Sequence, residues 1–166
     1  MRVGIALGSN LGDRLENLQK ARSAVERLPG VAGPILSSSV YSTSPVDCEA
    51  GARDFLNAVV EFDYEGDPRT LLPQLKAIET SLGRSPCSAQ NVSRAIDLDL
   101  LYAGALQIDE EKLRVPHPRM HDRRFVLQPL ADIRPELVLP GQEKPVSEVL
   151  ASLPQVDRVE RLTEDW

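Results

Sequence analysis

The sequence is short of several residue types and patterns that would mark a special class of protein. Its two cysteines, Cys48 and Cys87, stand in polar, turn-rich stretches without metal-ligand spacing, so we expect two free thiols rather than a disulfide framework. No apolar run approaches the roughly 20 residues that span a bilayer. The first residues also lack the layout of a signal peptide. We therefore expect a cytoplasmic protein with no membrane partner.

A surplus of basic residues is also missing. Lysine and arginine together number 19 against 25 acidic residues, which gives a formal net charge of −6. A surface that coats nucleic acid needs a basic excess, so we expect no nucleic-acid partner. The basic residues from position 84 to 124 nevertheless form a local island: Arg84, Arg94, Lys112, Arg114, Arg119, Arg123 and Arg124. In an acidic protein this island favours a small anionic ligand, with ordinary solvated surface charge as the alternative.

The composition and the apolar spacing predict the fold class. A chain of 166 residues with 42% apolar and 27% charged residues suits one globular domain over 1–166. Apolar spacing predicts strands over 2–8, 35–43, 55–62 and 95–102, and helices over 11–28 and 67–82. The order β-α-β-β-α-β is the split βαβ, or ferredoxin-like, pattern: an α+β fold with a mostly antiparallel sheet and helices on one face.

Shorter elements are expected around this frame. The turn at Gly8-Ser9-Asn10 is expected to supply the N-cap of the first helix. The C-terminal additions are a return strand over 105–108, an extended segment over 112–118, a helix from His121 and a short helix at about 145–152. Residues 84–93 have no periodicity and form a loop long enough to be a lid.

The strand over 95–102 carries an unusual pattern. Asp97 and Asp99 point to one face of an extended segment, while Ile96, Leu98 and Leu100 point to the other. Two like charges so close together repel each other and call for a cation. Mg²⁺ fits best, because it takes one or two carboxylates together with substrate phosphates. The alternative is a half-exposed edge strand with its leucines in the core and its aspartates in water.

No common phosphate-binding or nucleophile motif accompanies this strand. The sequence has no Walker A motif, no Rossmann glycine fingerprint and no nucleophile elbow. Side chains rather than a glycine-rich loop would therefore hold the phosphates of any nucleotide. Asn57 is a neutral amide in an apolar strand, so it should bond either a neighbouring loop or the polar edge of a ligand.

Four segments, read together, resemble one known family. They are Gly8-Ser9-Asn10-Leu11-Gly12; Tyr41-x-Thr43-x-Pro45 with Phe55-Leu56-Asn57; Gly83-Arg84 with Arg94-x-Ile96-Asp97-Leu98-Asp99-Leu100; and Val115-Pro116-His117-Pro118-Arg119-Met120 with Arg123-x-Phe125. Their order and spacing resemble 6-hydroxymethyl-7,8-dihydropterin pyrophosphokinase of folate biosynthesis over roughly residues 3–140. The resemblance implies an enzyme that transfers pyrophosphate from ATP, its co-substrate, to the hydroxymethyl oxygen of a reduced pterin. We expect it to act as a monomer.

The resemblance also implies roles for individual residues on the nucleotide side. Asp97 and Asp99 would hold two Mg²⁺ ions that bridge the ATP phosphates. The residues that would bind the nucleotide or neutralise its phosphates are Arg84, Arg94, Lys112, His117 and Arg123. Glu79 matches a carboxylate often seen in the family, with a solvated acid on a helix face as the alternative. His117 lies between two prolines, and the alternative to a role in binding is that it belongs to a rigid surface turn.

A second set of residues would form the pterin slot. Asn57 would pair with the donor and acceptor edge of the pterin, and Thr43 and Pro45 would line the pocket mainly by their backbone. Phe55 and Phe125 would sandwich the ring, although such residues are also common in cores. For Asn57 the alternative is a tie to a loop.

The sequence departs from the family pattern in two places. The loop before Arg94 lacks two cations and a tryptophan, with Pro86 and Asn91 among the residues found there instead. Pro118 stands where a tyrosine is frequent. A lid loop commonly completes a catalytic site on closing, so these departures leave a second hypothesis open: a non-catalytic or weakly active paralogue that binds pterin or nucleotide, or serves as an interaction module.

Overall fold

The computed structural model describes residues 1–45, 51–83, 93–155 and 158–166. Predictions on Arg84, the 84–92 part of the loop and both cysteines lie outside the described residues. No described helix is long and apolar enough to cross a membrane.

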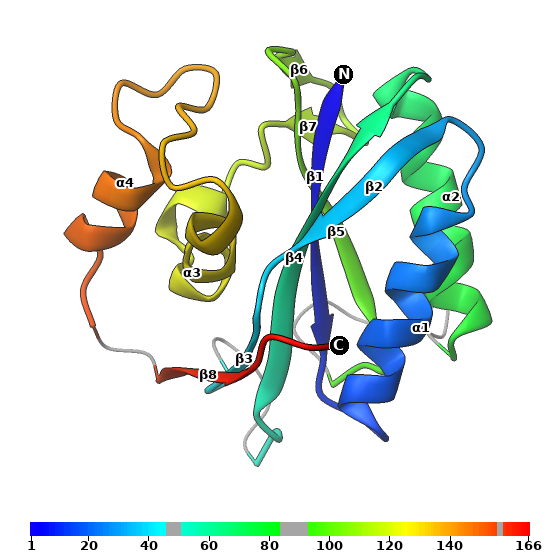
Figure 1. Ribbon diagram of the computed structural model, residues 1–166, viewed down its shortest axis with the longest axis vertical. Coiled ribbons are helices and arrows are strands. Elements are labelled where there is room, and N and C mark those ends of the chain that lie inside the picture. Colours follow the sequence, from blue (N-terminus) through cyan, green and yellow to red (C-terminus); the bar gives the residue numbers. More distant parts are fainter. Residues whose placement is uncertain (46–50, 84–92, 156–157) are drawn as a thin grey trace.

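A six-stranded antiparallel sheet forms the frame. Its strands are β1 (Arg2–Ser9), β2 (Val31–Ser37), β3 (Val40–Thr43), β4 (Phe55–Tyr64), β5 (Asp97–Ala103) and β8 (Val159–Thr163). The order across the sheet is β5-β1-β4-β3-β8, and β2 also pairs with β4 (Figure 1). The predicted α+β class with a mostly antiparallel sheet is confirmed.

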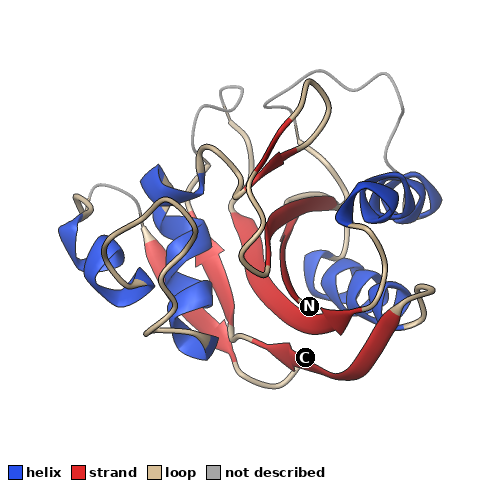
Figure 2. Cartoon of the chain, turned by 90° about the horizontal axis from the view of Figure 1, so that it is seen from above, coloured by secondary structure: helices blue, strands red, loops and turns tan. Residues whose placement is uncertain are grey.

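Helices cover both faces of this sheet. On one face lie α1 (Arg14–Glu26) and α2 (Pro68–Ser81), which pack on β1, β4 and β5 as the apolar spacing predicts. On the other lie α3 (Arg124–Ile133), α4 (Val146–Ser152) and the short 3₁₀ helix η1 (Met120–Asp122). Figure 2 shows the strands between these two groups of helices. The expectation of helices on one face therefore holds only for α1 and α2, because the C-terminal additions bury the second face.

Two apolar clusters result, one on each face. Ile5, Leu18 and Leu98 belong to the cluster under α1 and α2. Val59 and Leu127 belong to the cluster under α3 and α4. Alternate residues of β4 therefore serve different cores, which anchors the central strand in the sheet.

The first helix begins later than predicted. Asp13 is its N-cap and accepts the N–H of Glu16, so α1 starts at Arg14. The turn at 8–10 does not cap it, because the side chain of Asn10 is engaged elsewhere, as described below. The second helix matches its predicted start, with Asp67 accepting the N–H of Arg69.

The predicted strand over 35–43 is split in two. Ser38 interrupts it: its hydroxyl, rather than a backbone carbonyl, accepts the N–H of Val59 at 2.9 Å. The sheet partners therefore shift, and β2 and β3 pair with separate stretches of β4.

The predicted return strand over 105–108 is also wrong. β6 (Ile108–Asp109) pairs with β7 (Arg114–Val115) in a separate two-stranded hairpin instead. The short helix at 145–152 is confirmed as α4, whereas β8 was not foreseen.

Candidate active site

The two aspartates of β5 lie where the alternation predicts. Leu98 and Leu100 are buried in the α1/α2 core, while Asp97 and Asp99 face the opposite side of the sheet and stay partly exposed. The edge-strand alternative is correct in its topology, because β5 ends the sheet. The aspartates, however, face a cluster of charged groups.

Strand register places the pterin candidate and the acidic pair on one surface. Gly8 of β1 is the partner of Asn57 on β4 and of Asp97 on β5, so the three residues share a face. Strands two apart are separated by about 10 Å, which sets the scale between Asn57 and Asp97. A Cβ on Gly8 would lie 3.0 Å from Asn57 Oδ1 and 3.9 Å from Phe55. Gly8 therefore keeps the floor between the two halves of the site free of side chains.

Several basic groups offset the charge of the acidic pair. Arg94 Nη1 lies 2.9 Å from Asp97 Oδ2, with both side chains largely shielded from solvent. Burial, followed by the charge of Asp97, raises the pKa of Asp99. The groups that oppose this rise are His117, Lys76 and Arg123. The sequence predicts positive charge next to Asp97 and Asp99, and basic side chains of the protein supply part of it.

The orientation of His117 is set by its own loop. Its Nδ1 accepts the N–H of Arg119 at 3.2 Å, and its backbone N–H donates to the carbonyl of Leu101 at 2.8 Å. Burial lowers the pKa of His117, although Asp99 acts in the opposite direction. A neutral ring whose Nδ1 accepts carries its proton on Nε2, where it is a donor for an anionic oxygen.

Glu79 is not the solvated acid of the alternative interpretation. It is 1% exposed, and its Oε1 accepts the N–H of Leu98, between the two aspartates, at 2.7 Å. Lys76 Nζ lies 3.1 Å from its other oxygen. Burial raises the pKa of Glu79 against these two contacts. Glu79 therefore satisfies the free edge of β5 at the position of the acidic pair.

The predicted pterin residues gather at the start of β4. Asn57 is 7% exposed and its Nδ2 donates to Thr43 Oγ1 at 2.7 Å, so Thr43 contributes its side chain and not only its backbone. Thr43 is also the strand partner of Phe55, which is half-buried. Pro45 follows β3 closely.

Two further candidates lie at the start of α3. Arg123 is the N-terminal flanking residue of this helix, and its guanidinium lies 5.5 Å from the ring centre of Phe125. Phe125 is half-buried against the second core. Lys112 is exposed in the turn between β6 and β7, and its role stays a prediction.

Asn10 is a residue that the sequence reasoning misassigned to a helix cap. It is fully buried, its Oδ1 accepts the N–H of Arg94 at 2.7 Å, and its Nδ2 donates to Ser93 and, at 3.4 Å, to the carbonyl of Arg53. Asn10 therefore joins the approaches to β4 and β5. The Gly-Ser-Asn sequence directly after a buried strand was the available signal. Lys76 was also missed, although its spacing of three from Glu79 on one helix places them together.

The acidic pair fits Mg²⁺ as a partial ligand set. Among the described residues, no group of three or more His, Cys, Asp or Glu side chains forms a complete metal site. Mg²⁺ needs only one or two carboxylates when phosphate oxygens and water supply the rest. Asp97 and Asp99 meet this requirement, because they point to the same face of β5 and both stay partly exposed.

Comparison with known proteins agrees with this geometry. Residues 4–135 match the family model of 7,8-dihydro-6-hydroxymethylpterin-pyrophosphokinase. The chain is 41% identical to the 2-amino-4-hydroxy-6-hydroxymethyldihydropteridine pyrophosphokinase of Pseudomonas aeruginosa, over 97% of this chain and 96% of the relative. The enzyme of the same name from Bacillus subtilis is 43% identical, over 78% of this chain and 75% of the relative.

Solved structures share the fold. A crystal structure of HPPK-DHPS in complex with substrates superimposes with a TM-score of 0.68 at 17% identity, over 91% of this chain and 43% of that chain. HPPK-DHPS of Plasmodium falciparum gives a TM-score of 0.67 at 13% identity, over 90% and 44%. This chain thus spans less than half of those longer proteins.

Proposed function

The chain belongs to the 7,8-dihydro-6-hydroxymethylpterin-pyrophosphokinase family, and we propose that Asp97 and Asp99 are the centre of its pyrophosphoryl transfer. The enzyme moves a pyrophosphoryl group from ATP to the hydroxymethyl oxygen of the dihydropterin in folate synthesis. The observation that supports the residue assignment is the register Asn57-Gly8-Asp97, which brings the residue proposed for the pterin and the residue proposed for the metal onto one surface.

The nucleotide half of the site neutralises charge. Asp97 and Asp99 would hold Mg²⁺, and the family resemblance implies two ions. Bound Mg²⁺ would withdraw electron density from the ATP phosphates. Arg94, which contacts Asp97 in this structure, would bind a phosphate oxygen of ATP. Two more groups would bind the ATP phosphates. Arg123 directly precedes α3, and His117, with its Nε2, lies in the loop before η1.

The pterin half of the site orients the acceptor. Asn57 is held by Thr43 and presents its remaining amide groups to the pterin edge. Phe55 and Phe125 flank the ring, and Pro45 lines the pocket. The hydroxymethyl oxygen attacks the β-phosphorus and loses its proton to solvent. The bond from the β-phosphorus to the oxygen that bridges it to the α-phosphate breaks, and AMP leaves with that oxygen. Such a transfer depends on positioning and charge stabilisation more than on covalent catalysis. These residues would supply the positioning and the charge stabilisation.

The remaining assignments extend this proposal. Glu79 and Lys112 are assigned to the nucleotide side, together with Arg84, which lies outside the described residues. We also assign the chain to the cytoplasm, as a single domain that acts as a monomer on small molecules. The acidic net charge of −6 supports the assignment to small-molecule substrates rather than nucleic acid.

The test is pterin-dependent AMP formation. Wild-type protein with Mg²⁺ and ATP should release AMP only when the 6-hydroxymethyl-7,8-dihydropterin is present. Addition of a chelator should stop the reaction, and an excess of Mg²⁺ should restore it. A protein that binds both ligands but forms no AMP would instead be the non-catalytic module of the second hypothesis.

A further inference from the structure

The pterin side of the sheet is completed by a segment far away in the sequence. β3 has four residues, and its partners are β4 on one side and β8 on the other. Val159 of β8 is the partner of Thr43, the residue that holds Asn57. Without β8, β3 would be a short edge strand, and edge strands are held by half as many ladder hydrogen bonds.

The start of this segment joins both ends of the connection between β3 and β4. The N–H of Ser44, next to the end of β3, donates to the carbonyl of Arg158 at 3.1 Å. The N–H of Arg158 donates in return to Ser44 Oγ at 3.3 Å. Its guanidinium forms an ion pair with Asp54, the residue before β4. Arg158 thereby links the residues next to Thr43 and Phe55.

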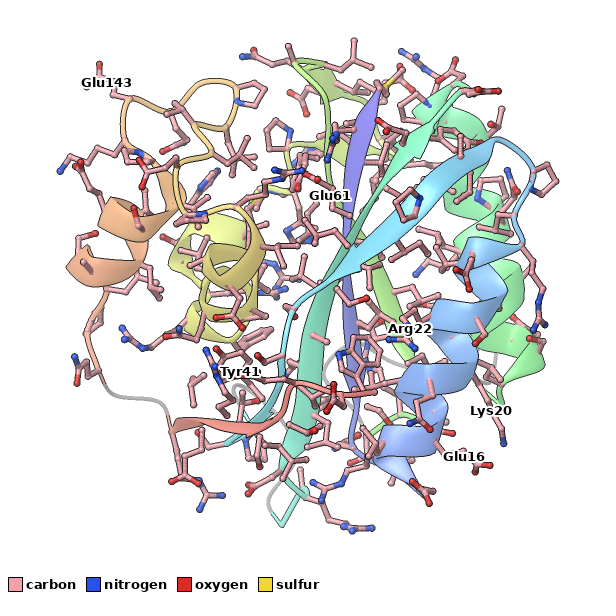
Figure 3. All side chains as sticks on the ribbon, in the orientation of Figure 1. Glu16, Lys20, Arg22, Tyr41, Glu61 and Glu143 are labelled. Carbon is pink, nitrogen blue, oxygen red and sulfur yellow. The ribbon has the colours of Figure 1, made fainter. Side chains whose placement is uncertain are left out.

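The rest of the segment is anchored to α3, to α1 and to Ser38, between β2 and β3. Arg161 contacts Asp132 of α3 at 3.3 Å, and Asp132 also accepts the hydroxyl of Tyr41 at 2.8 Å. Trp166 donates its indole N–H to the carbonyl of Ser38 at 2.7 Å. Arg22 of α1 lies 4.7 Å from the centre of its ring. Figure 3 shows Tyr41 near β8 and Arg22 on α1.

These contacts define what we call the C-terminal arm, residues 158–166. We propose that the arm sets the position of the pterin pocket, and that Arg158 is the positioning residue through which it acts. This inference rests on the proposed function and deepens its pterin half. The arm is fixed to α1 and α3 by contacts of its own, so it offers a rigid reference against which Ser44 and Asp54 are held. A pocket held in its binding geometry loses less conformational freedom when the ligand binds.

A variant at Arg158 can distinguish this positioning role from a general contribution of the arm to stability. Its side chain is half-exposed at 52%, and exposed ion pairs stabilise folded proteins little. The buried Trp166 and the Arg161–Asp132 ion pair hold the arm in place without it. Loss of the Arg158 side chain removes the ion pair with Asp54 but keeps the two backbone bonds to Ser44, so it should loosen the start of β4 while the arm remains docked.

The test compares Arg158→Ala and Arg158→Lys with wild type. Dihydropterin and ATP dissociation constants are measured by calorimetry, KM and kcat by AMP release, and the melting temperature by circular dichroism. Lys20→Ala is the matched control, because Lys20 forms an exposed ion pair with Glu16, at 3.1 Å, on α1.

We expect Arg158→Ala to raise the dihydropterin dissociation constant and KM about fivefold, the upper range for an exposed ion pair. The ATP dissociation constant and the melting temperature should stay the same. Arg158→Lys keeps the charge and should restore most of the affinity, and Lys20→Ala should change nothing. An unchanged dihydropterin affinity in Arg158→Ala, or an equal loss for ATP together with a lower melting temperature, would overturn the inference.

A double-variant cycle tests the route. If Arg158 acts through Asp54, Arg158→Ala should have no further effect on dihydropterin binding in an Asp54→Ala background. Full additivity would rule this route out. Wild-type protein that binds the dihydropterin without forming AMP would overturn the proposed function alone, and the binding comparison would still decide the role of Arg158. Failure of the wild type to bind the dihydropterin would overturn both.

Discussion

Asn57 and Asp97 lie in register on either side of Gly8, on the face of the sheet opposite α1 and α2. Asn57 and Asp97 stand on the two strands next to β1, so they lie about 10 Å apart, and Gly8 forms the floor between them. On the proposed assignment, the pterin ring and the phosphates of ATP would lie next to each other on this face. This relationship also makes Gly8 as important to the site as the residues that bear charge.

Gly8→Ala should therefore weaken dihydropterin binding. The added Cβ would lie 3.0 Å from Asn57 Oδ1, so the amide must shift from its place beside Thr43. We expect roughly a tenfold rise in the dihydropterin dissociation constant, because overpacking of this kind costs about 1–3 kcal/mol. Calorimetric titration with each substrate measures it. Unchanged pterin affinity would show that the ring does not lie over β1.

The contact between Thr43 and Asn57 gives a matched pair of variants. Thr43→Val removes the hydroxyl that accepts the Asn57 amide and keeps the shape, whereas Thr43→Ser keeps the hydroxyl. Thr43→Val and Asn57→Ala should each weaken dihydropterin binding by about 1–3 kcal/mol, the free energy of leaving a buried polar group unpaired. Thr43→Ser and the ATP affinity of all three variants should remain near wild type. Equal losses for both ligands would instead assign Asn57 a structural role.

Asn10 should behave differently, since it serves both halves of the site. Its side chain holds the backbone of Arg94 before β5 and that of Arg53 before β4. Asn10→Ala is therefore expected to weaken ATP and dihydropterin binding together, each by several-fold, on the order of one or two lost hydrogen bonds. Parallel titrations check it, and loss of only one ligand would contradict the linking role.

A stability prediction concerns the far end of the α3 face. Glu61 is 2% exposed and accepts hydrogen bonds from Arg2, Tyr102 and Arg134, beside a cleft of about 660 Å³ (Figure 3). Burial raises the pKa of Glu61, but the hydrogen bonds, that of Arg134 foremost, outweigh it and leave the pKa below the ordinary 4.5. Its negative charge is thus already compensated, so we assign this cleft no substrate.

The sign of the pH dependence follows from the lowered pKa. A carboxyl with a lowered pKa in the folded state stabilises the fold above its unfolded value of about 4.5 and loses this contribution as the pH falls through the folded pKa. Glu61→Gln should reduce the free energy of unfolding by about 2 kcal/mol at pH 7, seen as a melting temperature lower by about 4–8 °C. The difference from wild type should shrink below pH 4. A difference that stays constant from pH 7 to pH 3.5 would contradict this account.

The sequence predicted those features that depend on local patterns. The alternation around Asp97 and Asp99 determines which side chains enter the core, so the acidic face of β5 could be foreseen without knowing its neighbours. The N-cap and the apolar spacing of α2 likewise predicted a helix over 67–82, close to the observed Pro68–Ser81. The four motifs identified the family because their residues keep fixed distances along the chain.

Other features depend on contacts between distant segments and could not be predicted in this way. The burial of Glu79 follows from the packing of α2 on the free edge of β5, 19 residues further along the chain. The segment that forms β8 alternates only weakly between apolar and charged residues, and it becomes a strand because β3 offers it an unpaired edge. The side chain of Asn10 could cap a helix or join two loops, and only the folded chain decides between them.

The central claim is that Asp97 and Asp99 form the catalytic centre, and single-turnover AMP release by the Asp97→Ala, Asp99→Ala double variant tests it most directly. The variant and the wild type are each given the dihydropterin and a limiting amount of ATP with saturating Mg²⁺, after their melting temperatures have been compared. The account predicts that the variant folds, keeps its dihydropterin affinity and releases no AMP above the rate without pterin. Turnover near the wild-type rate in a folded double variant would contradict it.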